Sequence, residues 1–192
     1  MSIPHTTTNV GLHEYVTSQV LARYARPRLP AADLGSGPGG MAERLRSLGC
    51  DVTATDRDAG VLETDLPFVE LDFDQPDFAA KLGLDSFGLV TAIEVIEHVE
   101  SPIGFLRNVR RLLAPGGIAV VTTPNVEYNS TFENLPAGSF RHKDHRFEWT
   151  RSEFQEWCNR VANSNGYTVR FLPVGDEDRV LGSPTQMGVF TR

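Results

Sequence analysis

Two carboxylates and an imidazole stand close together in the segment Glu94-Val-Ile-Glu97-His98. In a helical turn, spacings of three and four residues place side chains on one face. Carboxylate oxygens and an imidazole nitrogen suit a divalent cation of mixed preference, so Mn²⁺, Fe²⁺ or Co²⁺ would fit as well as Mg²⁺. The same pattern also serves to orient a substrate or cap a helix without a metal, and both interpretations stand on these residues alone.

A second group of reactive side chains lies in the segment from Arg141 to Phe154, which reads RHKDHRFEWTRSEF. His145 offers a fourth metal ligand to the first group. Arginine forks bind phosphate well, and the basic side chains of this segment are Arg141, Lys143, Arg146 and Arg151. The aromatic rings of Phe147 and Trp149 could stack on bases, but we expect them to pack into the core.

A glycine-rich turn, Asp33-Leu-Gly35-Ser36-Gly37-Pro-Gly39, follows a short apolar run. Glycines at such a turn let the backbone approach a ligand closely, with the next helix pointing its N-terminus at that ligand. Asp56 ends the next expected strand, where an acid can bind both hydroxyls of a ribose. The order of strand, glycine turn, helix, strand and acid predicts a nucleoside cofactor, either NAD or S-adenosylmethionine.

The elements that must position these residues alternate along the chain. Apolar spacing predicts helices over residues 12–26, 41–48, 78–82 and 102–113, the last with Ile103, Leu106, Val109, Leu112 and Leu113 on one face. It predicts strands entering Asp33 and over residues 51–55, 68–71, 87–93 and 118–122. This alternation indicates an α/β fold with a doubly wound, mostly parallel sheet.

The last third of the chain departs from the alternation. Residues 123–150 form a long loop rich in Asn, Pro and Gly, and a loop of this length is typically functional. Thr150 and Glu153 then form a capping box that opens a helix, and residues 167–173 and 185–190 predict two closing antiparallel strands. We therefore expect seven strands in a single catalytic domain over residues 1–192, with an N-terminal helix within residues 1–28 and an active-site insertion at 123–150.

Composition excludes several classes of protein. The 192 residues suit one domain, no run approaches the ~18 apolar residues of a membrane span, and the N-terminus lacks a signal-peptide pattern. Cys50 and Cys158 form neither a zinc motif nor a disulfide framework. We expect a reduced, cytoplasmic protein without membrane association.

The negative charge is concentrated in one segment. The chain has a net charge of −7, and residues 56–77 alone hold eight acids against one Arg, namely Asp56, Asp58, Glu63, Asp65, Glu70, Asp72, Asp74 and Asp77. The rest of the chain is neutral, so the acidity belongs to the expected cofactor side. It is compatible with an RNA substrate that binds weakly, in a salt-sensitive manner and only at one end.

The glycine motif, the acid at Asp56, the triplet Leu71-Asp72-Phe73 and the segment Leu112-Leu-Ala-Pro-Gly-Gly117 resemble the class I S-adenosylmethionine-dependent methyltransferases. The resemblance implies a Rossmann-like fold and S-adenosylmethionine as cofactor, with Asp72 and Phe73 facing the adenine. An acidic lining also suits a cofactor that carries a sulfonium and an amino group but no phosphate. The implied cofactor contacts are Asp33, Gly35, Ser36, Gly37, Asp56, Asp72 and Phe73.

Glu94-x-x-Glu97-His98 together with the DHRFEWTR segment resembles one family, the small-RNA 3′-terminal ribose 2′-O-methyltransferases of the Hua-enhancer type. The resemblance implies a divalent metal, Mg²⁺ or Mn²⁺, held by the catalytic side chains of Glu94, Glu97, His98 and His145. The metal would grip both hydroxyls of the terminal ribose and lower the pKa of the 2′-hydroxyl. Either histidine could also take the proton.

The same resemblance implies an RNA 3′ end as the substrate, for which Asn125, Arg141 and Arg146 are the candidate contacts. An RNA-repair or RNA-binding protein acting in trans would be a compatible partner. Two alternatives remain open from the residues: a small-molecule O-methyltransferase acting on a diol or catechol, and a cofactor-binding module without catalysis. Retention of all four candidate metal ligands argues against the non-catalytic alternative.

Overall fold

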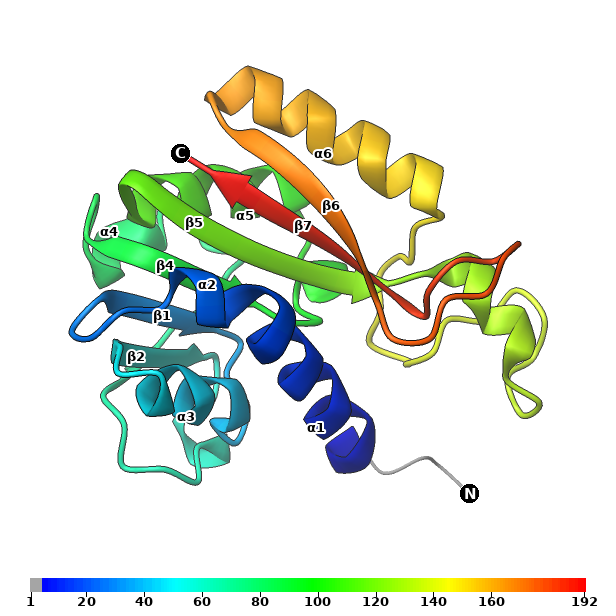
Figure 1. The fold of residues 1–192 in the computed structure, drawn as a ribbon, viewed down its shortest axis with the longest axis horizontal. Coiled ribbons are helices and arrows are strands. Elements are labelled where there is room, and N and C mark those ends of the chain that lie inside the picture. The colour runs from blue at the N-terminus through cyan, green and yellow to red at the C-terminus, as the bar shows by residue number, and fades with distance from the viewer. Residues whose placement is uncertain (1–4) are drawn as a thin grey trace.

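The computed structural model describes residues 5–192 and contains one seven-stranded sheet (Figure 1). The strand order is β3-β2-β1-β4-β5-β7-β6. β7 runs antiparallel to both of its neighbours, whereas the other pairs are parallel. The strands are β1 (Pro30–Leu34), β2 (Asp51–Asp56), β3 (Phe68–Glu70), β4 (Phe87–Ala92), β5 (Leu113–Pro124), β6 (Thr168–Val174) and β7 (Thr185–Thr191). The expected doubly wound α/β fold with an antiparallel closing pair is confirmed.

Helices cover both faces of the sheet. One face carries the N-terminal helical segment, formed by α1 (His5–Val16), the π-helix η1 (Thr17–Leu21) and α2 (Ala22–Tyr24), and beside it α3 (Gly40–Ser47). The other face carries α4 (Ala79–Leu82), α5 (Pro102–Leu112) and α6 (Arg151–Asn165). Each layer buries its own apolar cluster against the strands. Residues 1–4 of the expected N-terminal helix lie outside the described residues.

Local sequence explains where the two long helices on the second face begin. The Ser101 hydroxyl accepts a hydrogen bond from the Gly104 amide, and Pro102 occupies the first turn of α5, where proline is tolerated because its missing N–H would be unpaired anyway. At α6 the Thr150–Glu153 capping box forms as expected, with both reciprocal hydrogen bonds present. These caps fix the residues at which α5 and α6 begin.

Two expectations for the region around α5 are wrong. Ile103 is 58% exposed, because the buried face is set by Phe105 and residues two apart lie about 200° apart around a helix. The helix ends at Leu112, and β5 already begins at Leu113, earlier than expected. A register shift opposite β4, between Phe87 and Leu89, lets the Pro-Gly-Gly turn remain part of the strand.

The insertion at residues 123–150 has more structure than the sequence predicts. It contains the 3-10 helix η4 (Val126–Thr131), and an isolated parallel bridge joins Asn125 to Trp149 across its two ends. The loop therefore leaves and returns at one point of the sheet edge. Within residues 5–192, no helix is both long and apolar enough to cross a membrane.

Candidate active site

The candidate residues gather at the carboxyl ends of the central strands. β4 ends at Ala92, and the 3-10 turn η3 (Ile96–His98) follows it. The end of β5 supplies two buried threonines, Thr122 and Thr123, and the insertion brings His145 back to the same place. Carboxyl ends of strands are where open α/β sheets bind ligands.

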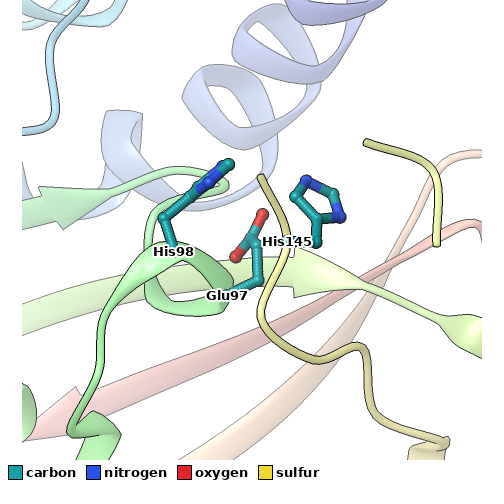
Figure 2. A group of neighbouring side chains, drawn as sticks. All are labelled: Glu97, His98 and His145. Carbon is teal, nitrogen blue, oxygen red and sulfur yellow. The ribbon is translucent and has the colours of Figure 1, made fainter. Parts of the chain in front are cut away.

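Glu97, His98 and His145 form the centre of the site, with one ligand atom from each lying within 4.8 Å of the others. Figure 2 shows the Glu97 carboxylate between the two imidazoles. Glu97 is completely buried; one carboxylate oxygen accepts a hydrogen bond from Thr123 Oγ1 at 3.1 Å, and the other has no partner. Burial and the nearby charge of Glu94 raise the pKa of Glu97 well above its usual value. A bound cation would relieve both penalties.

Both histidines are held through Nδ1. The Nδ1 of His145 lies 2.5 Å from Glu148 Oε1, and the Nδ1 of His98 lies 3.2 Å from the Asp144 carbonyl oxygen. A carbonyl oxygen can only accept, so Nδ1 of His98 carries the proton, and an ionised carboxylate makes the same demand of His145. Nε2 of each ring then carries the lone pair that a metal requires.

Glu148 is a buried acid beside His145 that sequence reasoning missed as a candidate site residue. It is 7% exposed, and besides His145 it accepts hydrogen bonds from the Arg141 amide at 2.7 Å and Asn129 Nδ2 at 2.5 Å. Although burial opposes ionisation, these hydrogen bonds hold the pKa of Glu148 below its usual value. The three-residue spacing from His145 was the available signal: an acid at that distance, among aromatic residues, can orient the imidazole.

Glu94 is placed differently from the other candidate ligands. Its φ of 55° is left-handed, an uncommon conformation for a residue other than glycine, and the helical turn begins only at Ile96. The expectation that Glu94, Glu97 and His98 share one face of a helical turn is therefore wrong. Thr122 Oγ1 donates to the Glu94 carboxylate at 2.9 Å, and burial raises the pKa of Glu94 to about 7. Glu94 therefore lies outside the three-residue cluster, but its charge acts on Glu97 within the cluster.

Arg146 fastens the insertion to η3. Its backbone N–H donates to the Glu97 carbonyl and its Nε to the His98 carbonyl, both at 2.9 Å, and its guanidinium lies 3.3 Å from Glu100. The side chain is 49% exposed. Arg146 thus holds the loop that carries His145 and leaves a half-exposed cationic side chain beside His98.

Arg141 and Asn125 hold the insertion together from inside. Arg141 donates from Nε to Asn129 Oδ1 at 2.6 Å and from a terminal nitrogen to the Asn125 carbonyl at 2.8 Å. Asn125 is fully buried, and its amide nitrogen donates to the carbonyls of Leu181 and Ser183. In this structure both side chains are used in building the loop.

A separate cradle lies at the ends of β1 and β2. Gly37 N–H donates to Asp56 Oδ2 at 3.0 Å, and the left-handed Gly35 could not carry a side chain, since a Cβ there would lie 2.6 Å from Val95. Asp33 accepts from Thr91 Oγ1 at 2.7 Å with one oxygen, while its other oxygen and the buried Ser36 hydroxyl have no partner. Burial raises the pKa of Asp33 to about 7. Unpaired buried polar groups of this kind fit a ligand that would satisfy them.

Asp72 and Phe73 follow β3 beside this cradle. Asp72 accepts hydrogen bonds from the Asp74 amide and the Gln75 side chain. The Phe73 ring packs edge-on against Phe78 and Phe105 at 5.3 and 5.6 Å. The ring is only partly buried, so it presents an apolar surface beside the cradle.

The chain matches the profile of the methyltransferase domain family over residues 16–165. Its fold agrees with that match: a methyltransferase from Archaeoglobus fulgidus superposes with a TM-score of 0.75 at 12% identity, covering 94% of each chain. The chain therefore belongs to the methyltransferase domain family. The family and its structural neighbours support S-adenosylmethionine as the cofactor.

Within that family, the chain belongs with the Hen1 methyltransferase domains. It is 31% identical to the methyltransferase domain of bacterial CtHen1-CN, covering 96% of this chain and 99% of that one, with a TM-score of 0.76. The small RNA 2′-O-methyltransferase of Xenopus tropicalis is 42% identical over 113 residues, or 55% of this chain and 29% of that protein. The Arabidopsis thaliana protein of the same name is 30% identical over 167 residues, or 78% of this chain and 16% of that protein. The chain thus spans less than a third of these curated relatives.

Proposed function

We propose that this domain transfers the methyl group of S-adenosylmethionine to the 2′-hydroxyl of the 3′-terminal ribose of small RNA, with a divalent metal at Glu97, His98 and His145. The observation that carries the proposal is this cluster, in which a buried carboxylate oxygen without a partner faces two imidazoles already fixed through Nδ1. Relatives named small RNA 2′-O-methyltransferases support the choice of substrate.

The donor set fits Mg²⁺ or Mn²⁺, with the two imidazoles favouring the softer of the two ions. Glu94, outside the cluster but hydrogen-bonded to Thr122, would supply a second negative charge and a fourth ligand. When bound, the metal would hold the two ribose hydroxyls and lower the pKa of the nucleophile.

The chain's own residues contribute the positions of the metal ligands and of the reacting groups. Glu148 keeps the His145 ring in one tautomer and orientation, so that its Nε2 faces the cluster. His98 has a pKa lowered by burial and by His145, which favours the neutral ring whose Nε2 lone pair a metal requires. Because both ring nitrogens would then be occupied, the 2′-hydroxyl proton would leave to water. The cradle at β1 and β2 would hold the cofactor close by, so that the oxygen and the methyl carbon meet in line.

We propose that Arg146 contacts the terminal phosphate, because its side chain is cationic, half exposed and adjacent to His98. Arg141 and Asn125 would act on the substrate indirectly, by holding the insertion that carries His145. We further propose that residues 1–192 work as one catalytic module, and that an RNA-repair or RNA-binding protein delivers RNA to it in trans.

The test is methyl transfer to matched short RNAs that end in a 2′,3′-diol, a 2′-deoxyribose or a 3′-phosphate. The proposal predicts transfer to the diol alone and loss of transfer in EDTA, with recovery when Mn²⁺ is added. Equal transfer to the 2′-deoxy end would contradict it, as would full activity in EDTA. Transfer to a catechol but to none of the RNAs would instead identify a small-molecule O-methyltransferase.

A further inference from the structure

His13 lies beside the glycine-rich loop of the cradle at the ends of β1 and β2, although it belongs to no motif in the sequence. A Cβ built on Gly40 would be 3.3 Å from His13 Nδ1 and 3.5 Å from its Cε1. The imidazole therefore rests on the backbone at the N-terminus of α3, one residue beyond the loop that ends at Gly39. α1 approaches α3 along this stretch (Figure 1).

The His13 ring is partly buried and makes no hydrogen bond to any of residues 11–192. Its backbone carbonyl accepts a hydrogen bond from Thr17 Oγ1 at 2.6 Å. Burial, and then the nearby charge of Arg44, lower the pKa of His13 to about 4, so the ring is neutral at physiological pH. A neutral imidazole has one N–H to donate and one lone pair. A polar ring that lies at a ligand cradle and has no partner among residues 11–192 is suited to a partner on the ligand.

The same loop holds two further buried polar groups without partners, Asp33 Oδ2 and Ser36 Oγ, on side chains from residues 2% and 6% exposed. A Cβ on Gly37 would meet no atom within 4 Å, so the turn faces open space. These observations, independent of the helix terminus, indicate that a polar ligand group belongs at this loop, which His13 adjoins at Gly40.

The charges of the cofactor identify that group. The amino-acid half of S-adenosylmethionine has an ammonium and a carboxylate, and the carboxylate is its one anionic group. The N-terminus of a helix such as α3 favours an anion, whereas the unpaired oxygen of Asp33 favours a cation. The ammonium therefore fits beside Asp33 and the carboxylate beside Gly40.

We propose that the His13 ring donates a hydrogen bond to the methionine carboxylate of the cofactor and so positions the methyl donor from α1. This role rests on the cofactor of the proposed function and is independent of its RNA substrate. The buried Val16 and Val20 anchor the helical segment to the sheet, and the π-helix between α1 and α2 begins at Thr17, directly after this turn. Interruptions of this type are frequent at functional sites.

The experiment compares two ligands by isothermal titration calorimetry in the absence of RNA. S-Adenosylhomocysteine has the carboxylate, and S-adenosyl-3-thiopropylamine, its decarboxylated analogue, lacks it. For His13→Ala we expect the Kd for S-adenosylhomocysteine to rise about tenfold, as for loss of a hydrogen bond to a charged group. The Kd for the analogue should change by less than about twofold, and His13→Gln should recover part of the loss. Glu14→Ala, an exposed neighbour on the same helix, is the matched control and should bind both ligands normally.

Equal losses for both ligands would show that His13 only supports packing, and no loss for either would show that it makes no contact; each result overturns the inference. A wild-type domain that binds neither ligand would overturn the cofactor assignment and this inference together. A domain that binds S-adenosylhomocysteine through His13 but methylates no RNA would overturn the substrate proposal alone. Thermal unfolding of each variant confirms that it is folded.

Discussion

The cradle at the ends of β1 and β2 and the Glu97–His98–His145 cluster lie at the same edge of the sheet but are built in different ways. The cradle comes from two adjacent strand ends and depends on backbone conformation, as in the Gly37 N–H that binds Asp56. The cluster joins side chains 47 positions apart, His98 and His145, and depends on a loop folding back. The cradle is therefore local and the cluster depends on tertiary contacts, so single substitutions should separate them.

Removing a ligand from the cluster should have the largest effect. His145→Ala is expected to lower kcat by about a thousandfold or more, since a catalytic metal contributes several kcal/mol to the reaction, while the Kd for S-adenosylhomocysteine stays the same. Single-turnover transfer and calorimetry measure the two quantities. His142→Ala is the matched control, because its ring lies 5.7 Å from that of His145 but outside the ligand set. Loss of cofactor binding in His145→Ala would contradict the separation of the two regions.

The cradle should show a pH dependence of stability that the cluster variants retain. In the folded protein the pKa of Asp33 is raised from 3.8 to about 7, so the folded state holds a proton that the unfolded chain releases. This stabilisation is complete below about pH 4 and is lost as pH rises through about 7, with an upper limit of about 4 kcal/mol. Asp33→Asn should therefore unfold at a denaturant midpoint that changes less between pH 4 and 8. An unchanged pH profile would show that burial does not govern this carboxyl.

Substitution of Asp56 should have the converse effect to substitution of His145: cofactor binding is weakened, and the metal site is retained. Asp56→Asn is expected to weaken S-adenosylhomocysteine binding about 10- to 100-fold, because hydrogen bonds from a ribose to a charged acceptor are lost. Its Mn²⁺ affinity, measured by electron paramagnetic resonance, should match that of wild type. Asp58→Asn, which removes a nearby exposed acid, serves as the control. A parallel loss of Mn²⁺ affinity would show that the cradle and the cluster are one site and would contradict their separation.

Glu148 tests whether the cluster depends on its supporting contacts. Glu148→Gln keeps an acceptor for His145 but removes the charge, and changes of this kind typically cost about 10- to 100-fold in metal affinity. The Mn²⁺ Kd gives the result directly, and Glu133→Gln supplies the same change at an exposed position of the same loop. If the Glu148→Gln domain has wild-type metal affinity, Glu148 does not support metal binding at the cluster.

The smallest effect is expected at the start of α6. Thr150→Ala removes one half of the capping box and should lower the free energy of unfolding by about 1 kcal/mol. Chemical denaturation measures this change, and kcat at saturating substrate should stay close to that of wild type. A large loss of activity without loss of stability would mean that this cap also positions the insertion.

The same contrast explains how far sequence reasoning reached. Periodicity located the strands, and the glycine turn with Asp56 located the cradle, because both are local patterns. The placement of Asn125, Arg141 and Glu148 could not be read from spacing, since it depends on contacts of the folded insertion. Arg141 has the chemistry of a phosphate ligand, yet its partners here are Asn129 and a backbone carbonyl. The left-handed backbone conformation of Glu94 could not be predicted either, because nothing in an acidic residue indicates a positive φ.

The most direct test of the central claim is the position of a bound ion in crystals soaked with Mn²⁺. We predict a single anomalous peak, coordinated by Glu97, His98 Nε2 and His145 Nε2, with the Glu94 carboxylate as a fourth ligand, and no such peak in His145→Ala. A peak elsewhere on the domain, or no peak in a protein that still methylates RNA, would contradict the proposed metal site.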